Sequence, residues 1–143
     1  MLRYINLWPP FFGAGIRVTR RNPDMKAVDV EMNLRFYNRN YVGTHYGGSL
    51  YSMTDPFYML MLIENLGPEF IVWDKAATIR FRKPGRSTLT AAFRIPPEEL
   101  VAIREAAEPG EPIDRTYTVD LVDREGVVHA SVEKVIYVKR REA

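Results

Sequence analysis

A long apolar segment that carries a single charge constrains the fold of this chain more than any other feature. The segment follows a polar loop rich in Asn and Gly, begins at Gly47-Gly48 and runs to Ile63, with Asp55 as its only charged residue. On a helical wheel its apolar side chains form two stripes, one of Leu50, Met53, Phe57 and Met61 and another of Tyr51, Tyr58 and Leu62. A helix that is apolar on most sides lies in a core. We therefore expect a long central helix, starting near Gly48, that other structure wraps.

The rest of the chain shows the period-two alternation of half-buried strands. The pattern predicts six strands, over residues 16–21, 28–36, 71–82, 89–95, 117–121 and 128–138, and a short helix over residues 97–107. Lys83-Pro84-Gly85-Arg86 predicts a turn that joins the third and fourth strands as a hairpin. Lys134 breaks the last alternation, which indicates a bulge or an edge. Strands with one dominant helix indicate an α+β fold, an antiparallel sheet wrapped around that helix.

The first twelve residues are apolar and aromatic but are interrupted by Asn6 and Pro9-Pro10. This stretch is too short for a membrane span and has no cleavage-site pattern. We expect a short helix that ends at the prolines and packs its apolar side chains on the body of the protein, namely Ile5, Trp8, Phe11 and Phe12. Contact of this aromatic end with a membrane surface is the alternative.

The composition argues against several classes of protein. A chain of 143 residues suits one domain, which we expect to cover residues 1–143. The near-balanced charge, formally +2, argues against a nucleic-acid partner, and no stretch predicts an integral membrane segment. Cysteine is absent, which excludes a disulfide framework, and His45 and His129 lack the spacing of metal ligands. We expect a cytoplasmic protein with no metal and no cofactor of its own.

Asp55 is the first candidate for chemistry, because an ionised carboxylate in an apolar segment needs a reason. A buried Asp is usually paired, protonated or placed for catalysis. The alternative is local, since Asp followed by Pro56 is also typical of a helix start, with Asp55 as the N-cap and the residues before it irregular. The residues alone leave both interpretations open.

The loop and helix start resemble the active-site segment of hotdog-fold acyl-CoA thioesterases of the phenylacetyl-CoA thioesterase type. The string Asn40-Tyr-Val-Gly43-Thr-His-Tyr46-Gly47-Gly48, followed after six residues by Asp55, is similar to their pattern Asn-x-x-Gly-x-x-His-Gly-Gly with a later Asp. One position departs, because Tyr46 stands where that pattern has His and the histidine of this chain is His45. A tyrosine, with an ordinary pKa of about 10, cannot act as a base at neutral pH.

A longer string, Gly-Thr-His-Tyr-Gly-Gly-Ser-Leu-Tyr-Ser-Met-Thr-Asp-Pro with Trp73-Asp74-Lys75 downstream, is similar to a bacterial hotdog family of unknown function over nearly the whole chain. Some members of that family are described as tetrameric acyl-CoA thioesterases. The resemblance implies an α+β hotdog fold, with an antiparallel sheet wrapped around one long central helix. It also implies a small-molecule acyl thioester as substrate, with coenzyme A as part of that substrate, and a homodimer or homotetramer.

Thioester hydrolysis needs an oxyanion site for the carbonyl oxygen and a group that attacks the carbonyl carbon or activates water. The N–H of Gly48 at the helix start is the candidate for the first. Asp55, by resemblance, is the candidate for the second, as nucleophile or general base. Seven helical residues would separate the two by about 10 Å, at about 1.5 Å per residue. We therefore expect a site that is shared between subunits.

Other residues have both a functional and a structural interpretation. Asn40 would orient the substrate or form the turn, and His45 would shuttle a proton or hold the loop. Three neighbours are expected to line the substrate site, namely Tyr46, Gly47 and Tyr51. A basic group would bind the phosphates of coenzyme A or form a solvated sheet face, and comprises Arg80, Arg82, Lys83 and Arg86. Trp73-Asp74-Lys75 would pair charges at an interface or line the pocket.

These observations predict a homo-oligomeric acyl-CoA thioesterase with Asp55 and Gly48 at its centre. Two rival functions remain. A hotdog dehydratase or hydratase would need His45 directed towards Asp55 to shuttle protons. A non-catalytic acyl-CoA- or lipid-binding protein would keep the fold and use Asp55 only as a helix cap.

Overall fold

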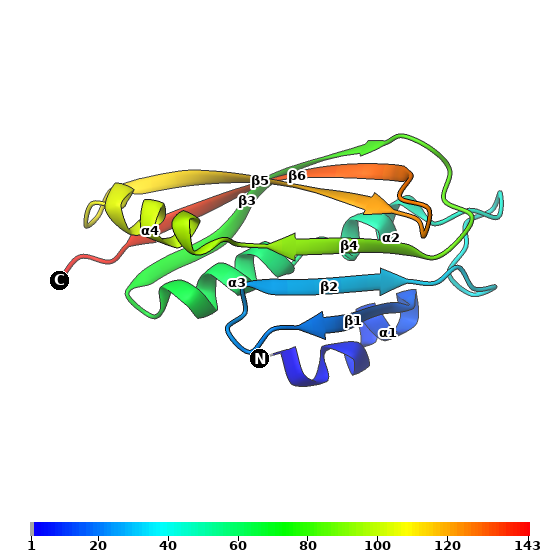
Figure 1. The fold of residues 1–143 in the computed structure, drawn as a ribbon, viewed down its shortest axis with the longest axis horizontal. Helices are drawn as coiled ribbons and strands as arrows, with labels where there is room; N and C mark the ends of the chain where they lie inside the picture. The colour runs from blue at the N-terminus through cyan, green and yellow to red at the C-terminus, as the bar shows by residue number, and fades with distance from the viewer. Residues whose placement is uncertain (1) are drawn as a thin grey trace.

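Six strands form a single sheet in the order β1-β2-β4-β5-β6-β3, and every pair of neighbouring strands is antiparallel (Figure 1). The computed structural model describes residues 2–143. The strands are β1 (Ile16–Arg21), β2 (Ala27–Met32), β3 (Phe70–Phe81), β4 (Leu89–Arg94), β5 (Pro112–Val122) and β6 (Val128–Arg140). The helices are η1 (Leu2–Leu7), α1 (Pro9–Ala14), α2 (Gly47–Ser52), α3 (Phe57–Leu66) and α4 (Pro97–Ala106). The predicted α+β class is confirmed.

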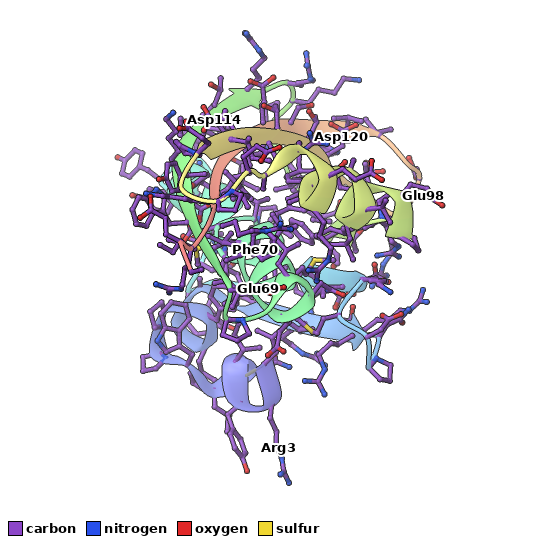
Figure 2. All side chains as sticks on the ribbon, turned by 90° about the vertical axis from the view of Figure 1, so that its left-hand side faces the viewer. Arg3, Glu69, Phe70, Glu98, Asp114 and Asp120 are labelled. Carbon is purple, nitrogen blue, oxygen red and sulfur yellow. The ribbon has the colours of Figure 1, made fainter. Side chains whose placement is uncertain are left out.

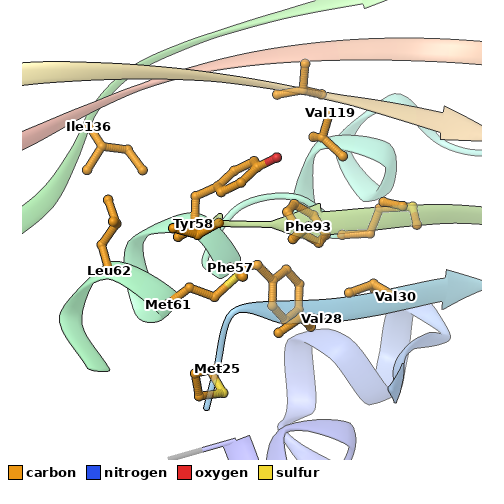
Figure 3. Close-up of a cluster of buried hydrophobic side chains, with 14 of the residues drawn as sticks. Met25, Val28, Val30, Phe57, Tyr58, Met61, Leu62, Phe93, Val119 and Ile136 are labelled. Carbon is orange, nitrogen blue, oxygen red and sulfur yellow. The ribbon is translucent and has the colours of Figure 1, made fainter. Parts of the chain in front are cut away.

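Helix α3 provides the centre of the core, which the curved sheet covers (Figure 1). Its residue Phe57 is fully buried, and the centroid of its ring lies 5.8 Å from that of Phe11 and 5.0 Å from that of Phe93. Tyr58 stacks on Tyr117 of β5 at 4.8 Å. Figure 3 shows these α3 side chains facing residues from the strands on more than one side. This surrounding explains why the segment is apolar around most of its circumference.

The expected continuous helix from Gly48 is interrupted. Helix α2 ends at Ser52, a turn follows, and α3 starts at Phe57. Pro56 explains the break, because its ring carries no N–H and disfavours helical geometry in the residue before it. Pro56, not Asp55, occupies the N-cap position of α3, and no side chain caps this helix. The Asp55 side chain is 52% exposed, so it is not the buried carboxylate that the apolar surroundings suggested.

Two expectations about the strands are wrong. β3 and β4 do not form a hairpin, since β3 pairs with β6 while β4 lies between β2 and β5. The second strand ends at Met32 instead of continuing to Phe36, a residue that is 82% exposed. Helix α4 does begin at the predicted Pro97, with its acidic first turn towards solvent at Glu98 (Figure 2). The local sequence patterns therefore predicted the positions of the strands better than the pairing between them.

The expected short helix before the prolines is η1, which ends at Leu7, and the prolines then begin a second helix, α1. Pro9 is the first residue of α1, and Phe11 is buried, but Trp8 and Phe12 remain 48% and 68% exposed. Met1 lies outside the described residues. Figure 2 shows Arg3 projecting from η1 away from the rest of the chain. No helix within residues 2–143 is long and apolar enough to cross a membrane.

The segment η1 also caps the middle of one edge strand, β1. The side chain of Asn6 donates from Nδ2 to the carbonyl oxygen of Val18 at 3.2 Å and accepts the N–H of Val18 through Oδ1 at 2.8 Å. Both backbone groups of this β1 residue are thereby satisfied by a side chain. β3, at the other end of the sheet, has a neighbouring strand on one side only within the described chain.

Candidate functional site

The start of α2 presents two glycines next to aromatic rings. The first bonds of the helix run from the N–H groups of Ser49 and Leu50 to the carbonyl oxygen of Tyr46, so those of Gly47 and Gly48 precede the helical ladder. A Cβ on Gly48 would lie 2.7 Å from the Tyr46 ring, and one on Gly47 would lie 3.2 Å from the Phe81 ring. Glycine is therefore needed for the rings to approach this backbone.

A pocket of about 450 Å³ lies beside this helix start. It is lined by Asn40, Thr44, His45, Gly47, Leu50, Phe81, Arg82, Lys83, Pro84 and Gly85. Five of the predicted site residues thus meet around one space, namely Asn40, His45, Gly47, Arg82 and Lys83. Asp55 and Tyr51 do not line this pocket.

Asn40 uses its side chain to organise the loop before α2. Its Nδ2 donates to Thr44 Oγ1 at 2.8 Å, and its Oδ1 accepts the N–H groups of Val42 and Thr44 at 3.1 and 2.9 Å. Its backbone N–H donates to the carbonyl oxygen of Thr44 at 2.7 Å. Gly43 completes the loop with a φ of +83°, a left-handed conformation that favours glycine. These bonds fit the structural interpretation of Asn40.

His45 is almost completely enclosed, with 3% of its surface exposed. Its Nε2 lies 2.6 Å from the carbonyl oxygen of Ser87, so Nε2 carries the proton and donates it there. Burial lowers the pKa of His45. The hydrogen bond to Ser87 acts in the opposite direction, and the charge of His129 lowers the pKa further. Its Nδ1 is buried and has no partner within the described chain. The side chain therefore holds the loop against the segment before β4 and offers no accessible base.

A second cluster forms around the break between α2 and α3, where Asp55 meets Lys134. The hydroxyl of Tyr51 donates to Asp55 Oδ1 at 3.1 Å. The Lys134 ammonium donates to the Tyr51 hydroxyl at 3.1 Å and to the backbone carbonyl of Asp55 at 2.9 Å. Its Nζ also lies 3.0 Å from Asp74 Oδ1 and 3.7 Å from Asp55 Oδ1. We call these four residues the Lys134 cluster.

Burial and charge act against each other in the Lys134 cluster. Burial raises the pKa of Asp74, although the Lys134 ammonium beside it acts in the opposite direction. Burial alone would lower the pKa of Lys134, but its bonds to Tyr51 and Asp74 outweigh that effect, and the net pKa lies above the ordinary value. Burial likewise raises the pKa of Tyr51, so its hydroxyl keeps its proton at neutral pH. Lys134 is thus charged at neutral pH despite its position.

The strand register explains how Lys134 and Asp74 meet. On β6, Lys134 keeps the same inward alternation as the buried residues Val132 and Ile136, so the bulge or edge expected at Lys134 is wrong. The irregularity lies on the neighbouring strand, between Asp74 and Ala76 of β3. Asp74 was expected to pair charges at an interface or to line the pocket, and it pairs with Lys134 of its own chain. Their only signal was a charged residue in an inward register of an apolar strand.

The predicted basic group does not gather on one surface. Arg80 and Arg82 lie beside Ser131 on the outer face of the sheet, where Arg82 Nε donates to Ser131 Oγ at 3.0 Å. Lys83 reaches the pocket beside α2, whereas Arg86 lines a separate depression with Asp123. Only part of this group lies near the helix start.

The remaining histidine ties two loops together. His129 Nε2 lies 2.9 Å from Asp123 Oδ2, and its Nδ1 lies 3.1 Å from the carbonyl oxygen of Pro84. The hydrogen bond to His129 is the main reason that the pKa of Asp123 lies below its ordinary value. Across residues 2–143, no group of three or more His, Asp or Glu side chains is arranged to hold a metal ion.

Several solved structures share this architecture. A protein from Pseudomonas aeruginosa, described as of unknown function and a probable thioesterase, superposes with a TM-score of 0.81 at 20% identity, over 92% of this chain and 87% of its own. A thioesterase from Haemophilus influenzae gives 0.69 at 14% identity, over 98% and 91%. A mutant of the phenylacetic acid degradation protein PaaI from Thermus thermophilus gives 0.63 at 17% identity, over 90% and 97%. At these identities the likeness establishes the fold, and the predicted hotdog fold is confirmed.

Sequence comparison gives a family in addition to a fold. No curated protein matches the sequence significantly. The family described as a domain of unknown function, DUF4442, matches residues 2–138, which is nearly the whole sequence. The chain therefore belongs to the DUF4442 family.

Proposed function

We propose that this protein is a homo-oligomeric acyl-CoA thioesterase. The observation that carries the proposal is the Asp55 carboxylate, which is half exposed at the helix break yet held through Oδ1 by the Tyr51 hydroxyl and the nearby Lys134 ammonium. Support also comes from proteins of the same fold that are described as thioesterases. A fixed and accessible carboxylate is suited to attack on a carbonyl carbon or to activation of water.

The reaction needs two groups of opposite character. Asp55 either attacks the thioester carbonyl itself or accepts a proton from an attacking water molecule. The N–H of Gly48 stabilises the negative charge that develops on the carbonyl oxygen. The carbon–sulfur bond then breaks, and coenzyme A leaves as the thiol while the acyl group becomes a free acid.

We infer that these two groups lie too far apart to serve one carbonyl within a single chain. Gly47 lies against Phe81, which pairs with Ala130 of β6, whereas Asp55 lies against Lys134 of the same strand. Four strand residues correspond to about 13 Å, at about 3.3 Å per residue. A complete site therefore combines the α2 start of one subunit with the Asp55 of another.

The edge strand β3 is the natural contact for the second subunit. It is twelve residues long, and its exposed residues include Ala76, Ala77 and Thr78. An unpaired edge of this length is a template for pairing with another chain. Two-fold pairing of β3 with β3 would place the inner faces of both sheets side by side, with the two halves of the site near the join.

Lys83 is suited to hold the phosphates of coenzyme A, because it lines the same pocket as Gly47. Arg82 also borders this pocket, although its Nε is bonded to Ser131 on the outer face of the sheet. The rival dehydratase or hydratase is less suited to this arrangement, since His45 is enclosed and bound to Ser87. A non-catalytic acyl-binding protein remains the alternative, because the bonds of Asp55 to its own chain also suit a structural carboxylate.

The test is thiol release from short, long and aromatic acyl-CoA substrates by the wild type and Asp55→Asn. We expect the substitution to lower kcat by about a hundredfold or more, the scale of a lost general base or nucleophile. Asp120→Asn, on the exposed outer face of β5, is the matched control and should retain activity. Thermal melting must show that all three proteins are folded. Full activity of Asp55→Asn, or no hydrolysis by the wild type, would favour the acyl-binding alternative.

A further inference from the structure

Lys134 is the one fully enclosed lysine in the described chain, and its position calls for an explanation. It lies in the middle of β6, on the inner face of the sheet, where its cross-strand neighbours are Ala77 and Tyr117. An ammonium group out of water costs several kcal/mol unless its partners compensate for the lost hydration. A methionine would fill the same space without that cost, so packing alone does not account for a lysine.

The partners of Lys134 point to the helix break. One is the Asp74 carboxylate at 3.0 Å, and the other two are the Tyr51 hydroxyl and the backbone carbonyl of Asp55. Lysine can only donate, so the Tyr51 oxygen accepts from Lys134 and its own proton is free for another acceptor. That acceptor is Asp55 Oδ1 at 3.1 Å. The order of contacts therefore runs from Asp74 through Lys134 and Tyr51 to Asp55.

This order fixes one oxygen of the carboxylate and leaves the other available. Within residues 2–143, the contacts of the Asp55 carboxylate all involve Oδ1, so Oδ2 has no protein partner. The Lys134 bond to the carbonyl of Asp55 also holds the backbone of the turn between α2 and α3. Side chain and backbone of Asp55 are thus held by the same ammonium group.

We propose that Lys134, held in turn by Asp74, is a positioning residue that orients the Asp55 carboxylate for reaction. The inference rests on the proposed function and adds a second layer to that site. Lys134 is fully enclosed and does not contact substrate, so its loss should lower kcat and leave KM nearly unchanged. A misplacement of about 1 Å at a reacting group can cost up to about a hundredfold, and we expect a loss of about tenfold to a hundredfold.

The test compares Lys134→Met with the double variant Asp74→Asn/Lys134→Met. The single variant leaves the Asp74 carboxylate without its cation and should melt at a lower temperature. The double variant removes both charges of the pair, and such neutral replacements often restore stability. We expect it to recover much of the melting temperature of the wild type but not its kcat. A purely structural role would restore both together.

Tyr51→Phe provides a second arm that keeps the Lys134–Asp74 pair intact. It removes the hydroxyl that joins Lys134 to Asp55 and should lower kcat in the same way. In an Asp55→Asn background, neither Tyr51→Phe nor the double variant should reduce the residual activity further, because the group they orient has been replaced.

The outcomes separate this inference from the proposed function. A fall in kcat that disappears in the Asp55→Asn background supports the positioning role. Wild-type kcat in Tyr51→Phe or in Asp74→Asn/Lys134→Met overturns the inference and leaves the thioesterase proposal intact. The inference is also overturned if Tyr51→Phe or the double variant lowers kcat by the same factor in the Asp55→Asn background as it does in the wild type. Lys134 would then act on a group other than Asp55. A wild type that hydrolyses no thioester overturns the proposed function and, with it, this inference.

Discussion

A site shared between subunits can be tested by inactivating its two halves in different chains. Gly48→Pro removes the N–H proposed to stabilise the oxyanion, and proline is tolerated in the first turn of a helix. Gly48→Ala is the matched control, because it keeps the N–H and adds a Cβ that would also lie 2.7 Å from the Tyr46 ring. Tyr46 is 59% exposed, so its ring has room to move aside. Loss of one oxyanion donor costs about 2.7–4 kcal/mol, and we expect Gly48→Pro to lower kcat by about 10²–10³-fold.

The decisive step is to mix Gly48→Pro with Asp55→Asn. About half of the dimers that form at random from equal amounts contain one chain of each kind, and two-fold symmetry gives each of these one intact site and one doubly altered site. The mixture should therefore regain about a quarter of the wild-type activity. The separation of about 13 Å along β6 is the basis of this expectation.

The assay is thiol release after the two variants are unfolded together and refolded, with different tags and native mass spectrometry to count mixed dimers. If mixed dimers form but activity stays at the level of the separate variants, the site lies within one chain and the distance argument is wrong. If Gly48→Ala is as inactive as Gly48→Pro, the added Cβ and not the lost N–H is responsible.

Three further predictions concern stability. Phe57→Ala should lower the free energy of unfolding by about 3–5 kcal/mol in urea titrations, because this fully buried ring packs between two others. Glu99 is bound by Arg115 at 2.7 Å, and although burial raises its pKa, Arg115 and Tyr117 outweigh burial and hold the pKa below the ordinary 4.5. Its contribution is then present above about pH 4.5 and lost as pH falls, so Glu99→Gln should flatten the acid side of a plot of urea midpoint against pH. Burial lowers the pKa of His45 from 6.5, so wild-type stability should decrease as pH falls below that value, and His45→Asn should reduce this slope.

The elements of the fold were accessible from the sequence because they depend on local patterns. Alternation located β1 and β3 within one residue. The partners of these strands were not accessible. A turn between two strands suggested a hairpin, but the connection from β3 to β4 joins strands that lie apart in the sheet. Pairing is decided by the packing of the whole sheet on α3, which no local pattern encodes.

The candidate site divides in the same way. The glycine pair and Asp55 stand out in the sequence because both are unusual residues within one short segment. Lys134 lies 79 residues from Asp55 in the chain, and only the fold brings the two together. For the helix break, the local signal was present but was outweighed. Pro56 indicated a break, whereas the apolar character of the whole segment favoured a continuous helix.

The contact between Asn6 and Val18 has a consequence for how far assembly can proceed. A sheet with two open ends can add chains without limit and form a fibre. Here the middle of β1 is already satisfied by the Asn6 side chain, so that end is a poor template for another strand. The proposed pairing of β3 with β3 would use the same edge of both copies and leave only the β1 ends outside, where Asn6 occupies the backbone groups of Val18. Under the proposed pairing, growth of the sheet would stop at two chains, and a larger oligomer would form through its faces.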